Sequence, residues 1–283
     1  MIRVAFFVNI SILYQSNAEM RLPLIYLIAL LMLPVSANSK SWQQSITKAP
    51  AGPYKEKKHC KLYYDLSWKG SLKAGKCEVE FKQNKGKSQP VQVISKGYSS
   101  GLVRSLFPYD FYYESKYNGS TLKPYNFNIW EKTKEETRNI YGTFKGNKVY
   151  TRDEITPLSG GKSQVRKSSF GYPQFFDLYS CVLYVGSQPL KKGEEVNMVI
   201  YPFDKPYLAK VKVLGREKHK GHQCIKLDLK MSKINQDLSL KHYDKMKSAT
   251  MWITDNDDRV MVELRSKIFI GDVRATLKKT EWY

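Results

Sequence analysis

Residues 61–81, KLYYDLSWKGSLKAGKCEVEF, decide the fold that we expect for this chain. Apolar residues occupy every second position on both sides of a turn around Gly70: Leu62, Tyr64, Leu66 and Trp68 before it, and Cys77, Val79 and Phe81 after it. A period of two is typical of strands with one buried face and one hydrated face. The stretch therefore predicts an antiparallel hairpin rather than a reactive site.

The chain contains four cysteines: Cys60, Cys77, Cys181 and Cys224. The hairpin pattern predicts Leu66 opposite Cys77, which leaves Cys60 about six residues, or roughly 20 Å, farther along the sheet. Because a disulfide needs Cα atoms within about 7 Å of each other, a Cys60–Cys77 bond is disfavoured. The pairing of the four cysteines otherwise stays open, since four cysteines allow several connectivities.

The same alternation recurs over residues 207–214, 225–231, 260–264 and 273–277, within roughly a dozen candidate strands joined by short turns. Two segments break this rhythm. Residues 99–107, SSGLVRSLF, predict a short helix capped by Ser99, and residues 173–185, PQFFDLYSCVLYV, predict a helix that covers one side of the sheet. We therefore expect a mainly β protein: a single curved antiparallel meander sheet, open or barrel-like, with one or two short helices.

The N-terminal region has the layout of an export signal. In residues 20–37, MRLPLIYLIALLMLPVSA, a basic Arg21 precedes an apolar run, and small residues end at Ala37. The run is about 12 residues long, whereas a membrane-spanning helix needs roughly 20, so cleavage is favoured over an uncleaved anchor. We expect residues 1–19 to be an extension from a misassigned start. Residues 38–59 predict a linker or loosely held arm, and residues 60–283 the β domain.

The charge of the chain is strongly positive. The formal net charge is +21, and most of the 47 basic residues are scattered lysines. Such a charge favours an anionic partner. Nucleic acid is disfavoured because the chain carries an export signal and because base and phosphate recognition relies mainly on arginine. Anionic lipid head groups or acidic envelope polymers are the expected partners, and a merely solvated basic surface is the alternative.

Four segments of the chain resemble one known family when they are taken in order: residues 62–81, then FFDLYSCVLYVGSQPLKKGEEV (175–196), VKVLGREKHKGHQCIKLDL (211–229) and MWITDNDDRVMVELRSKIFIGDVRATL (251–277). Together they resemble the domain of unknown function 3108 family of exported Gram-negative bacterial proteins. One departure is Met261, where that family commonly has proline. The resemblance implies a β-rich protein exported to the periplasm. It implies no established activity and no catalytic residues.

Two clusters contain residue types that bind metal ions: His219, His222 and Cys224, and Asp255, Asp257 and Asp258. The first cluster lies in one tight turn, with Cys224 expected on the hydrated face, and it has no evident fourth ligand for a tetrahedral site. The second resembles half of a calcium loop but lacks the glycine at the sixth position and the acidic residue at the twelfth. We expect polar turns at both places, with no metal and no other cofactor.

The leading functional hypothesis is non-enzymatic binding of a lipid-like or anionic envelope ligand in an apolar concavity of the sheet. The candidate lining residues are aromatic: Trp68, Phe81, Tyr112, Trp130 and Phe175. One alternative is a hydrolase of an envelope polymer that uses the carboxylates of Asp177, Glu217 or Asp255. Against it, Asp177 fits the start of a helix, and Glu217 can pair with Arg216 or a lysine. The other alternative is a scaffold that binds an envelope protein through an exposed sheet edge.

Overall fold

Sixteen strands form one sheet in the computed structural model, which describes residues 41–82, 90–243, 246, 248–268 and 271–283. The predicted signal peptide and the upstream extension lie outside the described residues. The strands are β1 (Cys60–Trp68), β2 (Leu72–Lys82), β3 (Val91–Ser99), β4 (Asp110–Tyr117), β5 (Pro124–Lys132), β6 (Glu136–Lys145), β7 (Lys148–Pro157), β8 (Gln164–Gly171), β9 (Phe175–Phe176), β10 (Glu195–Ile200), β11 (Tyr207–His219), β12 (His222–Ile234), β13 (Leu240–His242), β14 (Ser248–Thr254), β15 (Met261–Ile268) and β16 (Gly271–Trp282).

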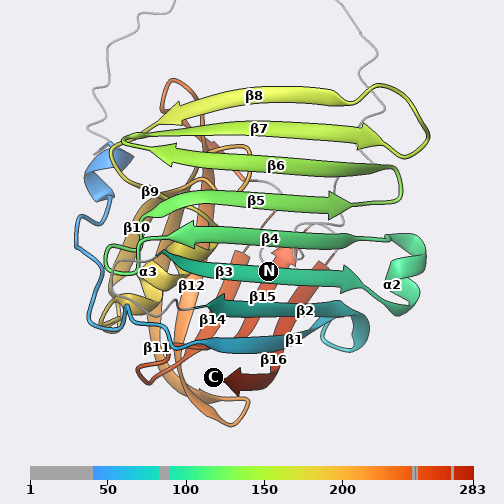
Figure 1. Ribbon diagram of the computed structural model, residues 1–283. Coiled ribbons are helices and arrows are strands. Elements are labelled where there is room, and N and C mark those ends of the chain that lie inside the picture. The colour runs from blue at the N-terminus through green and yellow to red at the C-terminus, as the bar shows by residue number, and fades with distance from the viewer. Residues whose placement is uncertain (1–40, 83–89, 244–245, 247, 269–270) are drawn as a thin grey trace, which may run out of the picture.

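The sheet is an open meander. Strands β1 to β8 pair in sequence, and β1 also pairs with β16, so the two ends of the domain meet in the middle of the sheet. The order continues through β15, β14, β12, β11 and β10 to β9, and all the ladders are antiparallel except the short β9–β10 pair. Strands β1–β8 form the front layer and the later strands run steeply behind it (Figure 1). This arrangement confirms the expected fold class.

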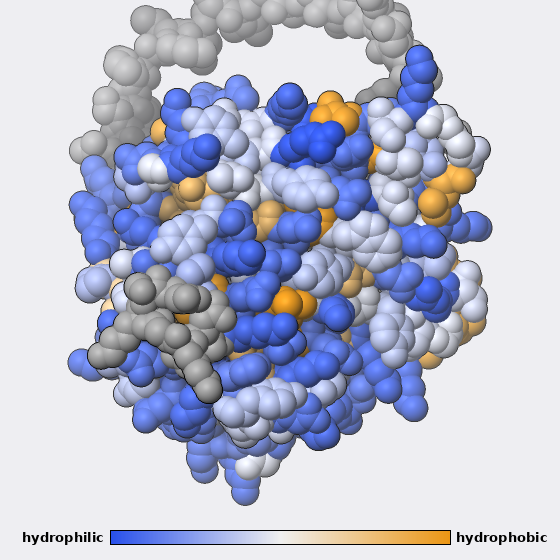
Figure 2. Space-filling view, viewed as in Figure 1, coloured by the Kyte–Doolittle hydropathy of each residue, from blue (hydrophilic) through white to orange (hydrophobic). Residues whose placement is uncertain are grey.

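The outer face of the front layer is predominantly hydrophilic, with isolated apolar side chains (Figure 2). Burial alternates along several of its strands, most clearly in β4, where every second residue is buried, whereas edge strand β8 is almost wholly exposed. The buried side chains face the concave side and form the core together with α3. Across the described ranges, no helix is long and apolar enough to cross a bilayer.

The first hairpin has a register different from the expected one. Leu66 lies opposite Gly75, and Cys77 lies opposite Tyr64, two residues from the predicted position. The turn is tighter than expected because Lys69 and Gly70 both adopt positive φ, of 52° and 78°, directly after the first strand. All four cysteines are buried and free, which confirms that Cys60 and Cys77 are not bonded to each other.

The first predicted helix is α2 (Gly101–Leu106), and its expected cap was wrong. Ser100 occupies the N-cap position and makes no capping bond with its side chain. Ser99 instead ends β3, and its hydroxyl accepts a hydrogen bond of 2.9 Å from the backbone N–H of Tyr109. The Ser99 hydroxyl therefore binds the loop after α2 and does not cap the helix.

The second predicted helix is α3 (Leu178–Ser187), and it lies between the two layers of the sheet (Figure 1). It begins later than the expected Pro173 because Phe175 and Phe176 form the edge strand β9. Most of its residues are buried, so it covers the concave side as expected. The open sheet and α3 therefore share one core.

Residues 41–59 are held more firmly than a linker would be. They contain one 3-10 turn, η2 (Trp42–Ser45), and then run across β10 and α3. Thr47 and Asn197 exchange hydrogen bonds of 2.9 Å, and the amide N–H of Tyr54 donates to the Ser187 carbonyl at 3.2 Å. The expectation of a loosely held arm was wrong, because backbone groups of this segment bond to the ordered elements. We call residues 46–59 the N-terminal arm.

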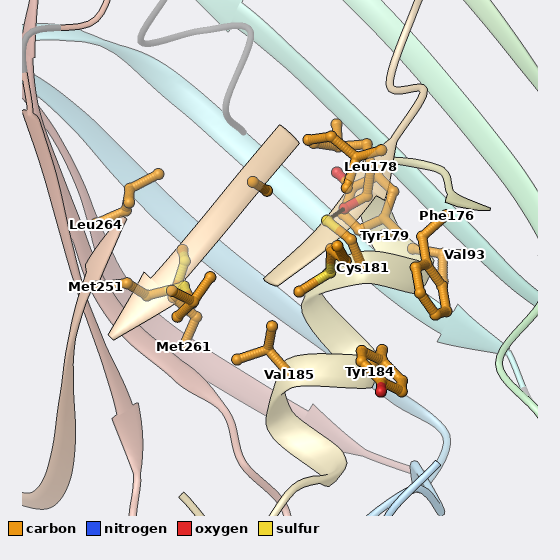
Figure 3. Close-up of a cluster of buried hydrophobic side chains, with 14 of the residues drawn as sticks. Val93, Phe176, Leu178, Tyr179, Cys181, Tyr184, Val185, Met251, Met261 and Leu264 are labelled. Atoms are coloured by element: carbon orange, nitrogen blue, oxygen red, sulfur yellow. Dashed lines mark hydrogen bonds between the residues drawn. The ribbon is translucent and has the colours of Figure 1, made fainter. Parts of the chain in front are cut away.

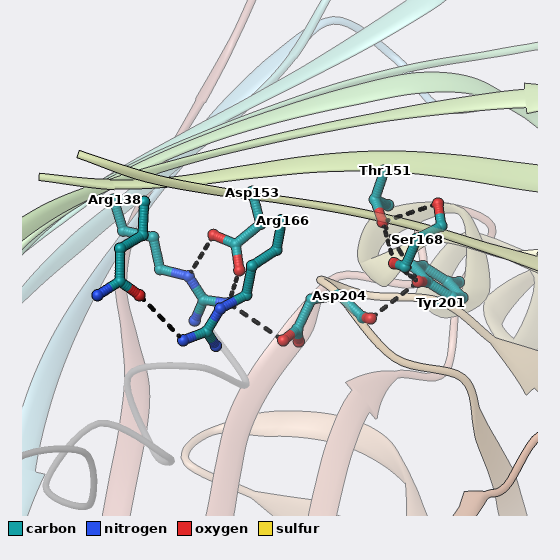
Figure 4. A network of polar contacts seen from close by, with 8 residues as sticks. Arg138, Thr151, Asp153, Arg166, Ser168, Tyr201 and Asp204 are labelled. Atoms are coloured by element: carbon teal, nitrogen blue, oxygen red, sulfur yellow. Dashed lines mark hydrogen bonds and ion pairs between the residues drawn. The ribbon is translucent and has the colours of Figure 1, made fainter. Parts of the chain in front are cut away.

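Side chains close the gap between the open edge at β8 and the loop after β10. Arg138 on β6 binds Asp153 on β7 through both carboxylate oxygens, at 2.7 and 2.5 Å, and reaches Asp204 in the loop at 3.1 Å (Figure 4). The Tyr201 hydroxyl lies 3.3 Å from the Ser168 hydroxyl on β8. The barrel-like shape is thus completed by side-chain contacts, because no ladder joins β8 to β9 in the described part of the chain.

Replacing Arg138 should test this closure. Arg138→Met leaves the Asp153 carboxylate, whose side chain is 6% exposed, without its cation, so we expect unfolding free energy to fall by about 3 kcal/mol. The control Arg152→Met breaks an exposed pair with Glu154 and should cost less than about 1 kcal/mol. Urea denaturation measures both changes, and equal losses would contradict a structural role for the Arg138 contacts.

Candidate functional site

An apolar pocket lies on the concave side of the sheet, beside α3. Its volume is ≈ 70 Å³, and it is partly enclosed. Its lining comes from the N-terminal arm, β1, β2, α3, β12, β14, β15 and the turn before β15: Tyr54, Lys57, Leu62, Tyr64, Val79, Phe81, Leu178, Tyr179, Val182, Leu183, Gly186, Leu229, Met251, Asp258, Arg259, Met261 and Leu264. A cavity of this size is several times what one water molecule needs, so it accommodates a short stretch of hydrocarbon chain.

The helix wall of the pocket is positioned by Asp177. The Asp177 side chain accepts hydrogen bonds from the N–H groups of Tyr179 (3.0 Å) and Ser180 (2.7 Å), and the Asp177 N–H donates to the Ser180 hydroxyl at 2.8 Å. The Ser115 hydroxyl on β4 donates to its other carboxylate oxygen. This capping box satisfies the N–H groups that a helix start leaves open and ties α3 to the front layer.

Burial raises the pKa of the Asp177 carboxyl above its usual range, although its hydrogen bonds to Ser115, Ser180 and Tyr179 act in the opposite direction. The carboxyl is fully buried and does not line the pocket. Asp177 therefore serves as the helix cap that the sequence suggested rather than as a catalytic group.

The wall opposite α3 is formed by flexible apolar side chains. Met251, Met261 and Leu264 extend from β14 and β15 toward the helix (Figure 3). The Tyr64 hydroxyl donates to the Met261 carbonyl at 3.0 Å and thereby holds β1 against β15. Because methionine has a flexible, unbranched side chain, this wall can adjust to a ligand without moving the strands.

Charged residues occupy one side of the pocket: Lys57 from the N-terminal arm, and Asp258 and Arg259 from the turn before β15. The Lys57 ammonium donates to the Asp258 carbonyl and lies 5.3 Å from the centre of the Phe81 ring. Burial is the main cause that lowers the pKa of Lys57, and the neighbouring Cys60 and Asp258 act in the opposite direction. A partly dehydrated cation thus sits directly beside the apolar wall.

Arg259 is held by stacking and by one carboxylate. Its guanidinium lies 4.2 Å from the centre of the Tyr54 ring, and its Nη1 donates to Asp255 at 2.8 Å. Its side chain is only 6% exposed, and its Nε atom has no hydrogen-bond partner. The sequence placed this arginine in a turn but did not suggest that it borders a pocket.

The structure does not bring the five predicted aromatic residues together. Phe81 lines the pocket, whereas Phe175 packs in the core beside Phe144, with ring centres 5.3 Å apart. Tyr112 and Trp130 lie opposite each other on β4 and β5 in a shallow groove of the outer face. Trp68 ends β1 and packs against Gly271, where a Cβ atom would lie 2.9 Å from Trp68 Nε1.

The other carboxylates of the predicted hydrolase are engaged in ion pairs. Glu217 accepts from Trp252 Nε1 at 2.7 Å and from Lys226 at 3.3 Å, and the Trp252 bond is the main cause that lowers the pKa of Glu217. Asp255 binds Arg216 (2.6 Å) and Arg259. Burial acts to raise the pKa of Asp255, but the bonds to the two arginines outweigh it and keep the pKa below its usual range. Low pKa values and cationic partners are unsuited to a general acid.

Neither predicted turn brings three or more metal-binding side chains together within the described residues. His219 instead stacks on Trp252, with ring centres 4.3 Å apart, and contacts Glu263 at 2.6 Å. Cys224 is completely buried against Trp252 and Val262. The expectation of a hydrated Cys224 was wrong because Trp252, from β14, covers that part of the outer face.

Comparisons with known proteins locate the chain in a family and a fold. A family model described as "Protein of unknown function (DUF3108)" matches residues 63–278. A β-barrel-like protein of domain of unknown function DUF1849 from Brucella abortus is 9% identical, with a TM-score of 0.52 over 80% of this chain and 98% of that chain. The Mycobacterium tuberculosis lipoprotein LppX is 12% identical, with a TM-score of 0.25 over 85% of this chain and 90% of that chain. No curated protein matched.

Removing the helix cap should destabilise the pocket wall. Asp177→Ala removes the acceptor of two backbone N–H groups and leaves the buried Ser115 hydroxyl unpaired, so we expect a loss of about 2–4 kcal/mol in unfolding free energy. The control Asp65→Ala changes a carboxylate that is 47% exposed and should cost less than about 0.5 kcal/mol. A urea titration in which both variants match the wild type would rule out the capping role.

Proposed function

Because the chain belongs to the DUF3108 family, whose description assigns no activity, we propose its function from the pocket: it is an exported, non-enzymatic protein that binds the apolar chain of a lipid-like ligand beside α3. The observation that carries this proposal is the partly enclosed apolar pocket between α3 and β1, β2, β14 and β15. Ligand sites are concave, mostly apolar and furnished with a few polar groups, and this pocket has that composition.

Burial of apolar surface would drive the binding of such a chain. Most of the pocket lining is apolar, and each CH₂ group that moves from water into such surroundings contributes roughly 0.8 kcal/mol.

The two alternatives receive less support. A hydrolase needs free carboxylates facing a cleft, whereas Asp177 caps a helix and Asp255 and Glu217 are bound by cations or by Trp252. A scaffold needs an exposed sheet edge with an apolar face. Edge strand β8 is exposed, but its side chains are mainly polar and include Arg166 and Lys167, and charges of this kind protect an edge from pairing with another chain.

The proposal places the protein in the periplasm after removal of residues 20–37. Export to that compartment would expose the pocket to envelope lipids, and the basic surface would suit their anionic head groups. N-terminal sequencing of the protein isolated from the periplasm should yield a chain that begins close to Asn38. A mature chain that starts before Met20, or that keeps the segment 20–37, would contradict this part of the proposal.

Filling the pocket from the helix should weaken ligand binding. Leu183 is a half-buried pocket residue of α3, so Leu183→Trp should weaken binding of a fluorescent single-chain fatty acid by about tenfold or more, because the indole occupies the space of the ligand. Leu158→Trp adds the same group at a site that is 47% exposed and outside the pocket, and should leave affinity unchanged. Circular dichroism checks that both variants fold.

Fluorescence titration of the mature chain decides between the outcomes. Equal affinity in a folded Leu183→Trp variant and in the wild type would show that the fatty acid binds elsewhere. Absence of binding to the wild type would remove the lipid-like ligand altogether.

A further inference from the structure

On the charged side of the pocket, the basic groups outnumber the carboxylates that could neutralise them. The Asp258 carboxylate is bound by Lys58 at 3.0 Å, and the Asp255 carboxylate is shared by Arg216 and Arg259. Lys57 has only the neutral carbonyl of Asp258 as a hydrogen-bond acceptor, and no described carboxylate forms an ion pair with it. An ammonium group held by a carbonyl beside an aromatic ring lacks the partner that partly buried charges require.

Arg259 carries a second unsatisfied group at the same place. Its Nε–H is buried without an acceptor, and a buried donor left in this state is destabilising. Stacking on Tyr54 and the bond to Asp255 fix the guanidinium, so it cannot readily turn toward water. Gly186 of α3 lies against this side chain: a Cβ atom at Gly186 would be 3.5 Å from Arg259 Cβ.

The two cationic groups are neighbours. The carbonyl that accepts from Lys57 belongs to the peptide bond between Asp258 and Arg259, and both side chains line the pocket. The same pocket is lined by apolar side chains, including Phe81, Met251 and Leu264. A cationic side next to an apolar lining matches a molecule with an anionic end and a hydrocarbon chain.

We propose that the ligand is a single-chain amphiphile with an anionic head group, and that Lys57 and Arg259 bind this head group at the charged side of the pocket. The proposal rests on the proposed function, because it needs the chain to occupy the pocket. The head group supplies the anion that Lys57 lacks, and the guanidinium of Arg259 adds a second positive charge beside it. The apolar residues hold the chain, so head group and chain are recognised by separate parts of the site.

The test compares two probes of equal chain length, dodecanoate and dodecanol, on the mature protein by competition with the fluorescent fatty acid. The wild type should bind dodecanoate at least about tenfold more tightly than dodecanol, since only the carboxylate forms charge-assisted hydrogen bonds with Lys57 and Arg259. Lys57→Met keeps the length of the side chain and removes its charge. It should lower this preference to about twofold or less, because dodecanoate loses the cation that binds its carboxylate.

Two controls make the result specific. Lys55→Met changes the net charge by the same amount on the same arm, outside the pocket lining, and should keep the full preference for dodecanoate. Arg259→Lys keeps the charge but removes the planar guanidinium that stacks on Tyr54, and should weaken dodecanoate binding by about threefold to tenfold. Inorganic phosphate, which has no chain, should compete at least about 100-fold less effectively than dodecanoate.

The outcomes separate the two proposals. Equal binding of both probes, or an undiminished preference for dodecanoate in Lys57→Met, would overturn the head-group assignment and leave the pocket function intact. Competition by inorganic phosphate as strong as that by dodecanoate would overturn the amphiphile. Failure of both probes to bind the wild type would overturn the pocket function and this inference with it.

Discussion

The buried carboxylate of Asp177 is the interaction on which the concave side of this protein depends. It caps α3 through two backbone N–H groups and at the same time accepts from Ser115 on β4, so one side chain sets both where the helix begins and how it sits on the sheet. Dehydration of the buried carboxyl outweighs the effect of these hydrogen bonds on its protonation, so the pKa of Asp177 is raised. The pocket exists because α3 is held at this position and leaves a gap on the side of β14 and β15.

The open sheet imposes a second constraint. Its edges at β8 and β9 are not joined by a ladder in the described ranges, and the contacts of Arg138 and Tyr201 close the gap instead. In a closed barrel, the hydrogen bonds between neighbouring strands fix the stagger of the strands and the width of the interior. Here side chains join the two edges, so that constraint is absent and the interior can hold a helix as well as side chains. The fold thus provides an interior that is filled on one side by α3 and the aromatic core and is left partly empty on the other.

The sequence reveals the strands well and the site poorly, for physical reasons. Alternation identifies the long strands because one face of each is buried, but the two-residue strand β9 is too short to show a period. In β4 aromatic residues stand on both faces, so alternation alone could not show that Tyr112 faces outward while Tyr113 is buried. Lys57 and Arg259 were missed because they lie outside the strands, and only the folded chain brings the N-terminal arm beside the turn 255–259.

The most direct test of the account is a titration of the mature protein with dodecanoate, followed by NMR of methionine methyl groups. Met251 and Met261 line the pocket, whereas Met198 lies in β10 and Met231 in β12, outside the lining. If the ligand chain lies beside α3, the methyl signals of Met251 and Met261 should shift and those of Met198 and Met231 should stay in place. Shifts confined to Met198 and Met231, or none at all at saturating dodecanoate, would contradict the assignment of this pocket as the binding site.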